Sequence, residues 1–240
     1  MGVNNEIGII HPLAEIGKIC RERGIYLHTD AAQALGKIKL DVEEMNIDLM
    51  SMTAHKMYGP KGIGALYVRR NPKVRISPLL HGGGQERGIR SGTLSPALVA
   101  GFGEACSIAQ NDMEKDHQKI KMLYDRLRSR IFSVLKNAKL NGDDKIRFPG
   151  NINISFEGVD AGQLMNSLEE IALSSGSACN SACSEPSYVL MALGHGRERA
   201  QSSIRIGIGR FTTQQEIDYA CDRIIENVRK QVIVNKGKIK

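Results

Sequence analysis

The 240-residue sequence has no apolar run long enough to cross a bilayer. Its start, Met1 to Glu6, is not a signal peptide, and it does not fit a myristoylation signal, which has Ser or Thr where Glu6 stands. The five cysteines are odd in number and lack the spacing of a disulfide framework, which favours a reducing compartment. We therefore expect a cytoplasmic protein with no membrane partner.

Blocks of like charge are also scarce, although the formal net charge is +7. Basic residues alternate with acids, as in residues 114–116 and 197–199, and only the tail at 235–240 is a basic run. We interpret that tail as a solvated end and expect no nucleic-acid partner. A hydrophobic content of 41% and a charged content of 25% are typical of a globular protein of one or two domains.

The most informative stretch runs from Ser51 to Gly62 and places one lysine in a small-residue turn. Apolar runs at 47–52 and 63–68 flank it, which predicts a strand, a tight turn and a second strand. Lys56 lies among hydroxyl, imidazole and glycine groups at a strand end. Such a lysine suits Schiff-base chemistry, because a partly desolvated amine loses its proton more readily. The alternative is an ordinary loop lysine, since short motifs mislead.

The segment before this stretch predicts a parallel α/β arrangement. A helix is expected at 11–24 and a strand at 25–28, followed by the strand before Lys56. Alternation of strand and helix implies a parallel sheet whose ligands lie at the carboxyl ends of the strands. Asp30, Gln33 and Lys56 all fall at such ends.

A glycine-rich loop at 81–93 contains two arginines and ends in hydroxyl side chains. Such a loop can bind a phosphate through backbone N–H groups and positive charge, and the alternative is a plain surface loop. A long helix from Pro96 to about Leu135 then leaves one domain for the next. We expect a first domain at 1–112 and a second at 113–240.

The second half predicts a smaller α+β domain. Thr213 and Glu216 form a capping box that opens a final helix with an apolar face. The other expected elements are three strands and a helix, at residues 152–156, 171–173, 203–208 and 161–169.

A loop of small residues at 174–186 contains two cysteines, Cys179 and Cys183. Cys179 has no bulky neighbour, and an accessible thiol on such a loop can carry a group between two places. No Cys or His pair follows at zinc-site spacing, which disfavours a structural zinc. The role of a small buried hydrophobe suits the remaining cysteines on apolar helix faces: Cys20, Cys106 and Cys221.

Together these motifs resemble the cysteine desulfurases of the IscS type, which are pyridoxal-phosphate enzymes of fold type I in the class V aminotransferase group. The resemblance runs from Val3 almost to the end of the chain. It implies an α/β fold: an incomplete large domain of the pyridoxal-phosphate transferases, with a mostly parallel sheet, and a smaller α+β C-terminal domain. The matching motifs occur in the family's order, at residues 4–8, 29–33, 54–56, 81–93, 174–179 and 202–205.

The resemblance implies a role for each residue of a pyridoxal 5'-phosphate site. Lys56 would hold the cofactor covalently and then move protons, and Asp30 would pair with the pyridinium nitrogen so that the ring acts as an electron sink. Asn5 and Gln33 would hydrogen-bond the phenolic oxygen. The phosphate would be bound by three side chains, the last reaching the neighbouring subunit of a homodimer: Thr53, His55 and Thr93.

The resemblance also implies the substrate and the sulfur carrier. Arg205 would bind the carboxylate of L-cysteine, a task that suits its planar guanidinium. Cys179 would attack the substrate sulfur, leaving L-alanine and an enzyme persulfide. The sulfur would pass to an iron–sulfur scaffold protein or another acceptor, and Cys179 would serve as an iron–sulfur cluster ligand shared with that scaffold.

The family's first strands, its Gly-Ala-Thr-type phosphate loop and its ring-stacking histidine have no counterpart in this sequence. The C-terminal extension is replaced by the short basic tail, and Cys183 stands where housekeeping members usually have Ser. A sheet without those strands exposes an edge, which favours completion by a partner. The alternatives are therefore a truncated non-catalytic paralogue, or half of a split enzyme, that binds a desulfurase subunit or scaffold, and a related selenocysteine lyase.

Overall fold

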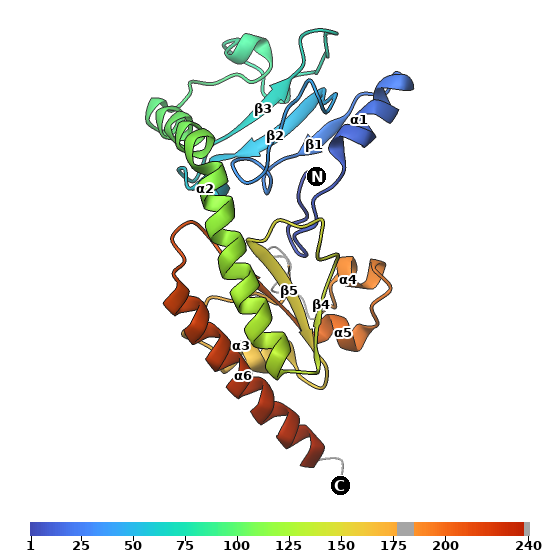
Figure 1. The fold of residues 1–240 in the computed structure, drawn as a ribbon. Coiled ribbons are helices and arrows are strands. Elements are labelled where there is room, and N and C mark those ends of the chain that lie inside the picture. The colour runs from blue at the N-terminus through green and yellow to red at the C-terminus, as the bar shows by residue number, and fades with distance from the viewer. Residues whose placement is uncertain (177–184, 238–240) are drawn as a thin grey trace. The chain divides into compact units, whose positions relative to one another are not determined.

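The computed structural model describes residues 1–176 and 185–237, and the chain forms two compact units (Figure 1). The first unit comprises residues 1–2 and 11–113, and the second comprises residues 3–10 and 114–240. Residues 3–10, which the sequence analysis placed in the first domain, pack with the second unit because Val3 to Ile10 bond to the segment around Arg147 and Asn151.

The first unit contains a sheet of three strands in the order β1 (His28–Asp30), β2 (Leu49–Thr53) and β3 (Gly64–Val68). β1 and β2 are parallel, with Asp30 opposite Ser51, whereas β2 and β3 are antiparallel. This sheet is therefore mixed rather than mostly parallel, because a short connection can join β2 to β3 only as an antiparallel pair.

The strand predicted at 25–28 begins later, at His28. Ile25 and Tyr26 are exposed, and regular pairing begins only where β2 offers a partner. The backbone N–H groups of Asp48 and Leu49 donate to the carbonyl of Leu27 and mark that starting point.

Helix α1 (Leu13–Glu22) follows Pro12, as predicted, and precedes β1. Gly17 allows the helix to approach the carbonyl of Met45, because a Cβ at this position would lie 1.8 Å from that oxygen. No other residue fits this close approach.

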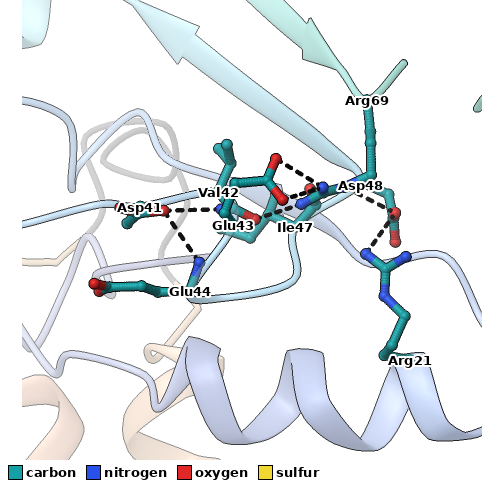
Figure 2. A network of polar contacts seen from close by, with 8 residues as sticks. All are labelled: Arg21, Asp41, Val42, Glu43, Glu44, Ile47, Asp48 and Arg69. Atoms are coloured by element: carbon teal, nitrogen blue, oxygen red, sulfur yellow. Dashed lines mark hydrogen bonds and ion pairs between the residues drawn. The ribbon is translucent and has the colours of Figure 1, made fainter. Parts of the chain in front are cut away.

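A polar network fixes the amino end of β2 to the carboxyl end of β3 (Figure 2). Arg69, 4% exposed, donates through Nη1 to both carboxylate oxygens of Glu43, at 2.8 and 2.7 Å. Its Nε lies 3.4 Å from Oδ1 of the buried Asp48, which Arg21 approaches at the same distance. Asp48 also accepts from the N–H of Leu27 at 2.9 Å. The network therefore holds the strand that leads to Lys56.

Helix α2 (Pro96–Val134) extends over the predicted range, and its first part packs in the first unit. Phe102 and Ala105 form an apolar cluster with Ala54 and Met57, two residues of the one-turn helix η1 (Ala54–Met57). This cluster positions the turn that contains Lys56.

The second unit is built on an antiparallel sheet in the order β4 (Ala138–Leu140), β5 (Asn151–Phe156) and β6 (Ser203–Gly207). Its apolar side chains, including Ile152, Ile154 and Phe156, are fully buried. The helices of this unit are α3 (Ala161–Asn166), α4 (Tyr188–Ala192), α5 (Arg197–Gln201) and α6 (Gln214–Gly237).

The capping box that opens α6 is confirmed. Thr213 Oγ1 accepts from the N–H of Glu216 at 3.2 Å, and the Glu216 carboxylate accepts from the N–H of Thr213 at 2.7 Å. Ion pairs join α6 to the second part of α2, and the two helices lie side by side in Figure 1.

The strand predicted at 171–173 is wrong. Only Ser174 pairs there, in an isolated bridge with Arg205. The helix predicted at 161–169 is shorter than expected and ends at Asn166.

Among the described residues, no helix is long and apolar enough to cross a membrane.

Candidate active site

The carboxyl ends of the parallel strands β1 and β2 bring several predicted residues to one edge of the first unit's sheet. β1 ends at Asp30 and β2 ends at Thr53, and the N–H of Ala31 donates to the carbonyl of Ser51 at 2.8 Å. Asp30 is exposed, and its Oδ1 accepts from the N–H of Ala32 at 2.7 Å. This edge is where parallel sheets bind ligands.

Lys56 is exposed because its neighbours in η1 are anchored. Ala54 and Met57 are buried against α2, so that His55 and Lys56 are left on the exposed side of the turn. Tyr58 then ends the turn with a φ of 67°, in the left-handed region. The amine therefore lies on a short, well-packed element that directly follows β2.

Thr53 and His55 form a pair beside this lysine. Thr53 Oγ1 lies 2.8 Å from His55 Nδ1. A hydroxyl and an imidazole together supply hydrogen-bond donors of the kind that bind a phosphate. His28 Nε2 and Ser51 Oγ, which the sequence analysis did not single out, form a second such pair at 2.8 Å on the same two strands.

Gln33 follows β1 by three residues and is half-buried. Its Oε1 accepts from Lys37 Nζ at 3.1 Å. Its position in the turn after Asp30 agrees with the predicted grouping of both residues at one strand end.

The glycine-rich loop is held closed by its own side chains. The N–H of Gly92 donates to Gln85 Oε1 at 3.0 Å, and the N–H of Gly84 donates to Ser91 Oγ at 3.3 Å. Thr93 follows on the exposed surface of the first unit. No described hydrogen bond joins Thr93 to the other predicted residues, so its assignment stays a prediction.

In the second unit the structure brings Asn5 and Arg205 together. Arg205 Nη1 donates to the carbonyl of Asn5 at 2.7 Å, and Asn151 Nδ2 donates to the same oxygen at 3.0 Å. The backbone of Arg205 pairs with Ser174 in both directions, at 2.6 and 3.2 Å. Two predicted residues distant in the sequence thus lie beside the amino-terminal end of the cysteine-containing loop.

Glu6 is a buried acid that the sequence analysis did not weigh. It is 2% exposed, and burial raises the pKa of its carboxyl, an effect that a hydrogen bond with Ser187 and the charge of Arg205 oppose. No local pattern distinguishes Glu6 from an exposed acid such as Glu15, which also directly precedes an isoleucine.

Cys179 and Cys183 lie outside the described residues, and their predicted roles stay predictions. Among the other cysteines, Cys221 is buried and Cys20 is half-buried, but Cys106 is exposed, so the prediction that Cys106 is buried is wrong. The reason is that α2 carries apolar residues on more than one face, and only one of them packs in the first unit. Within residues 1–176 and 185–237 no three His, Cys, Asp or Glu side chains gather as metal ligands.

The first unit is thus an α/β unit that presents an amine, a carboxylate and a hydroxyl–imidazole pair at the carboxyl edge of its strands. This arrangement is typical of a site for a small phosphorylated carbonyl compound. The family described as Aminotransferase class-V matches residues 1–220, and the chain belongs to this family.

The chain is similar to proteins named cysteine desulfurase. It is 56% identical over 230 residues to "Cysteine desulfurase IscS" of Rickettsia felis, covering 96% of this chain and 56% of that protein. It is equally identical to "Cysteine desulfurase" of Homo sapiens, covering 96% of this chain and 50% of that protein. The chain therefore spans about half the length of the curated relatives that it matches.

Solved structures show the same fold. A NifS-like protein from Rickettsia africae superposes with a TM-score of 0.85 at 29% identity, covering 94% of this chain and 60% of that one. A second NifS-like protein gives a TM-score of 0.84 at 33% identity, covering 94% and 59%. The predicted α/β class, of the fold that these NifS-like proteins share, is confirmed. The second unit, residues 3–10 and 114–240, is larger than the first in this chain, so the second domain is not the smaller of the two here.

Proposed function

We propose that the chain acts as a pyridoxal-phosphate-dependent cysteine desulfurase, which converts L-cysteine to L-alanine and transfers the sulfur to one of its own cysteines. The observation that carries the proposal is the grouping of Asp30, the Thr53–His55 pair and Lys56 at the carboxyl edge of β1 and β2. The names of the relatives at 56% identity support the same activity.

The residues present fit the cofactor, because each chemical group of pyridoxal phosphate has a complementary side chain. When bound, the cofactor withdraws electrons from the α-carbon of the substrate. Lys56 supplies the amine that holds it and later moves protons, and Asp30 pairs with the ring nitrogen. The remaining assignments are Thr53 and His55 to the phosphate, Asn5 and Gln33 to the phenolic oxygen, and Thr93 to the phosphate of the neighbouring subunit in a homodimer.

The second unit supplies the substrate and sulfur chemistry. Arg205 binds the substrate carboxylate through its guanidinium. The thiolate of Cys179 attacks the sulfur of L-cysteine, so that the C–S bond breaks and an S–S bond forms. The carbon takes up a proton, and L-alanine leaves with the persulfide on Cys179. In this assignment the first unit supplies most of the cofactor-binding residues, and the second unit supplies Asn5 and the thiol.

The acceptor of the sulfur is an iron–sulfur scaffold protein or another thiol protein, with Cys179 as a shared cluster ligand. We infer a cytoplasmic location from the cysteine usage. A relative at 58% identity, from Arthroderma benhamiae, is named as mitochondrial, which makes that compartment the competing location.

The test is incubation of the purified chain with pyridoxal phosphate and L-cysteine, followed by measurement of alanine and of persulfide on the peptide that contains residues 177–184. We expect Cys179→Ser to abolish the persulfide and leave the cofactor absorbance intact. Cys183→Ser is the matched control and should retain persulfide formation. Loss of both persulfide and cofactor absorbance in Cys179→Ser would contradict the assigned role.

A further inference from the structure

One face of the second unit's sheet carries polar side chains where residues 3–10 pack against it. On β5, Asn151 and Asn153 alternate with buried isoleucines, so the two amides lie on the opposite face of the strand from those isoleucines. Across the antiparallel ladder Asn153 pairs with Arg205 of β6, which puts the Arg205 side chain on the same face as the amides. Two amides and one guanidinium are therefore close neighbours on this face.

Residues 4–8 form a tight turn against the same face. The N–H of Gly8 donates to the carbonyl of Asn4 at 3.0 Å, and Asn4 Oδ1 accepts from the N–H of Glu6 at 2.9 Å. Gly8 has a φ of 73°, and a Cβ at this position would lie 2.6 Å from the carbonyl oxygen of Asn151. The turn is thus closed by its own hydrogen bonds and lies in direct contact with the first residue of β5.

The carbonyl oxygen of Asn5, within this turn, accepts two side-chain hydrogen bonds. Arg205 Nη1 donates to it at 2.7 Å, and Asn151 Nδ2 donates to it at 3.0 Å. Asn151 Nδ2 also lies 3.5 Å from the carbonyl oxygen of Asn4, and Asn153 Nδ2 donates to the carbonyl of Glu6 at 3.3 Å. The amides of β5 therefore hold successive carbonyls of the turn, and the middle one is shared with the guanidinium.

The Asn151 amide acts as a donor at this position. Its Oδ1 is buried and has no hydrogen-bond partner among the described residues, which is unfavourable for an acceptor. An apolar side chain would avoid that cost, but it would remove the second donor from the Asn5 carbonyl. That carbonyl in turn engages one nitrogen of the Arg205 guanidinium, and because the group is a rigid plane, fixing one nitrogen limits the directions of its other N–H groups.

We propose that Asn151 is a positioning residue: its amide fixes the carbonyl of Asn5, and that carbonyl orients the guanidinium of Arg205 for a substrate carboxylate. This inference rests on the proposed function, in which Arg205 binds the carboxylate of L-cysteine. In this role Asn151 touches neither substrate nor cofactor and acts through Asn5 and Arg205.

The test is a double-mutant cycle of Asn151→Ala and Arg205→Lys, with L-cysteine as the substrate. Asn151→Ala should raise KM about fivefold and leave kcat within about twofold of wild type, because substrate binding alone is weakened. In the Arg205→Lys background, the same change should raise KM by less than about twofold, because lysine lacks the planar group that the carbonyl orients.

Asn137→Ala is the matched control, because Asn137 Nδ2 also donates to a backbone carbonyl of the second unit, that of Glu157, at 2.8 Å. An equal rise in KM in both backgrounds, or a rise as large in the control, would overturn the positioning role. If Arg205→Lys releases no alanine, the KM–kcat split of Asn151→Ala against the control decides. If Asn151→Ala does not fold, Asn151→Leu takes its place, since leucine has a similar shape and no donor.

Hydrogen exchange of the peptide that contains residues 3–10 separates a failure of this inference from a failure of the proposed function, because it needs neither substrate nor cofactor. Asn151→Ala should exchange these amides at least about threefold faster than Asn137→Ala. Equal exchange in the two variants would overturn the positioning role whatever the activity. Faster exchange in a chain whose wild type releases no alanine would refute the proposed function and leave the hold of Asn151 on the turn supported.

Discussion

Lys56 is exposed while the residues on either side of the His55–Lys56 pair, Ala54 and Met57, are buried. The buried neighbours fix the backbone that carries the amine. The side chain of Lys56 is exposed and therefore contributes little to packing. Function and stability are thus separable at this position.

We predict that Lys56→Ala abolishes covalent attachment of pyridoxal phosphate while changing the free energy of unfolding by no more than about 0.5 kcal/mol. The measurement is borohydride reduction of the chain with the cofactor, followed by peptide mass spectrometry. Lys61→Ala, another exposed lysine of the same connection, is the control and should still be labelled at Lys56. Labelling of the Lys56→Ala chain elsewhere at the wild-type level would contradict the assignment.

The thiols of Cys106 and Cys221 differ in access. Cys221 is fully buried on α6, and burial raises its pKa to about 11, whereas Cys106 is exposed on α2. A thiol reagent at neutral pH should therefore modify Cys106 in the native chain and Cys221 only after addition of denaturant, because the thiolate is the reactive form. Peptide mass spectrometry resolves the two sites. Equal rates of modification of Cys106 and Cys221 in the native chain would contradict the burial of Cys221 in the packing of α2 against α6.

At the scale of elements, the first unit depends on the polar network around Arg69 (Figure 2). This side chain connects the loop that contains Glu43 to the end of β3, and it approaches the buried Asp48 at the start of β2. A buried network of this kind fixes strand ends that have few apolar contacts of their own.

We predict that Arg69→Ala lowers the free energy of unfolding by about 3 kcal/mol, because Asp48 is left buried with Arg21 as its remaining cation. Urea denaturation monitored by circular dichroism measures the change. The control is Lys39→Ala, which breaks the exposed ion pair with Glu44 and should cost less than about 1 kcal/mol. Equal losses in the two variants would show that the network does not stabilise the unit.

Long and strongly patterned elements were predictable from sequence. The ranges expected for β2, β3, α2, β5 and β6 and the capping box of α6 agree with the structure to within a few residues. The short elements β4, α4 and α5 were missed, since three to five residues carry too little periodicity to be recognised. The apolar run at 171–173 resembles a strand, yet no neighbouring strand is available to pair with more than Ser174.

At the scale of the whole molecule, ion pairs between α2 and α6 add to the apolar core of the second unit. Asp218 accepts from Arg126 at 2.6 and 2.7 Å and from Arg130 at 2.6 Å. These arginines lower the pKa of its carboxyl to about 2. Since a depressed pKa favours the charged form in the folded state, the stabilisation is present above the ordinary carboxyl pKa and is lost as pH falls.

We therefore predict that the unfolding midpoint in urea falls between about pH 4 and pH 2, and that Asp218→Asn flattens this part of the profile. Asp125→Asn is the control, because its partner Lys121 lies on the same helix and the pair joins no two elements. An unchanged slope of the pH profile in Asp218→Asn would refute the assigned pair.

Glu6 acts in the opposite sense. Because burial raises the pKa of its carboxyl, the fold becomes less stable as pH rises above the ordinary carboxyl pKa.

The sequence by itself determined the family, the α/β class and the chemical identity of the proposed site. Those features depend on residue types and their order: a lysine after a strand, an aspartate after another, and a cysteine in a loop of small residues. Order along the chain also placed Asp30 and Lys56 at the same edge, because parallel strands end together.

Only the tertiary structure decided which distant segments meet. Residues 3–10 pack with the second unit rather than with the helix that follows them, and Arg205 reaches the carbonyl of Asn5 across 200 positions of the sequence. Glu6 becomes buried, at 2% exposure, only through that packing. The physical reason is that burial and charge pairing depend on neighbours in space, whereas a sequence pattern records only neighbours along the chain.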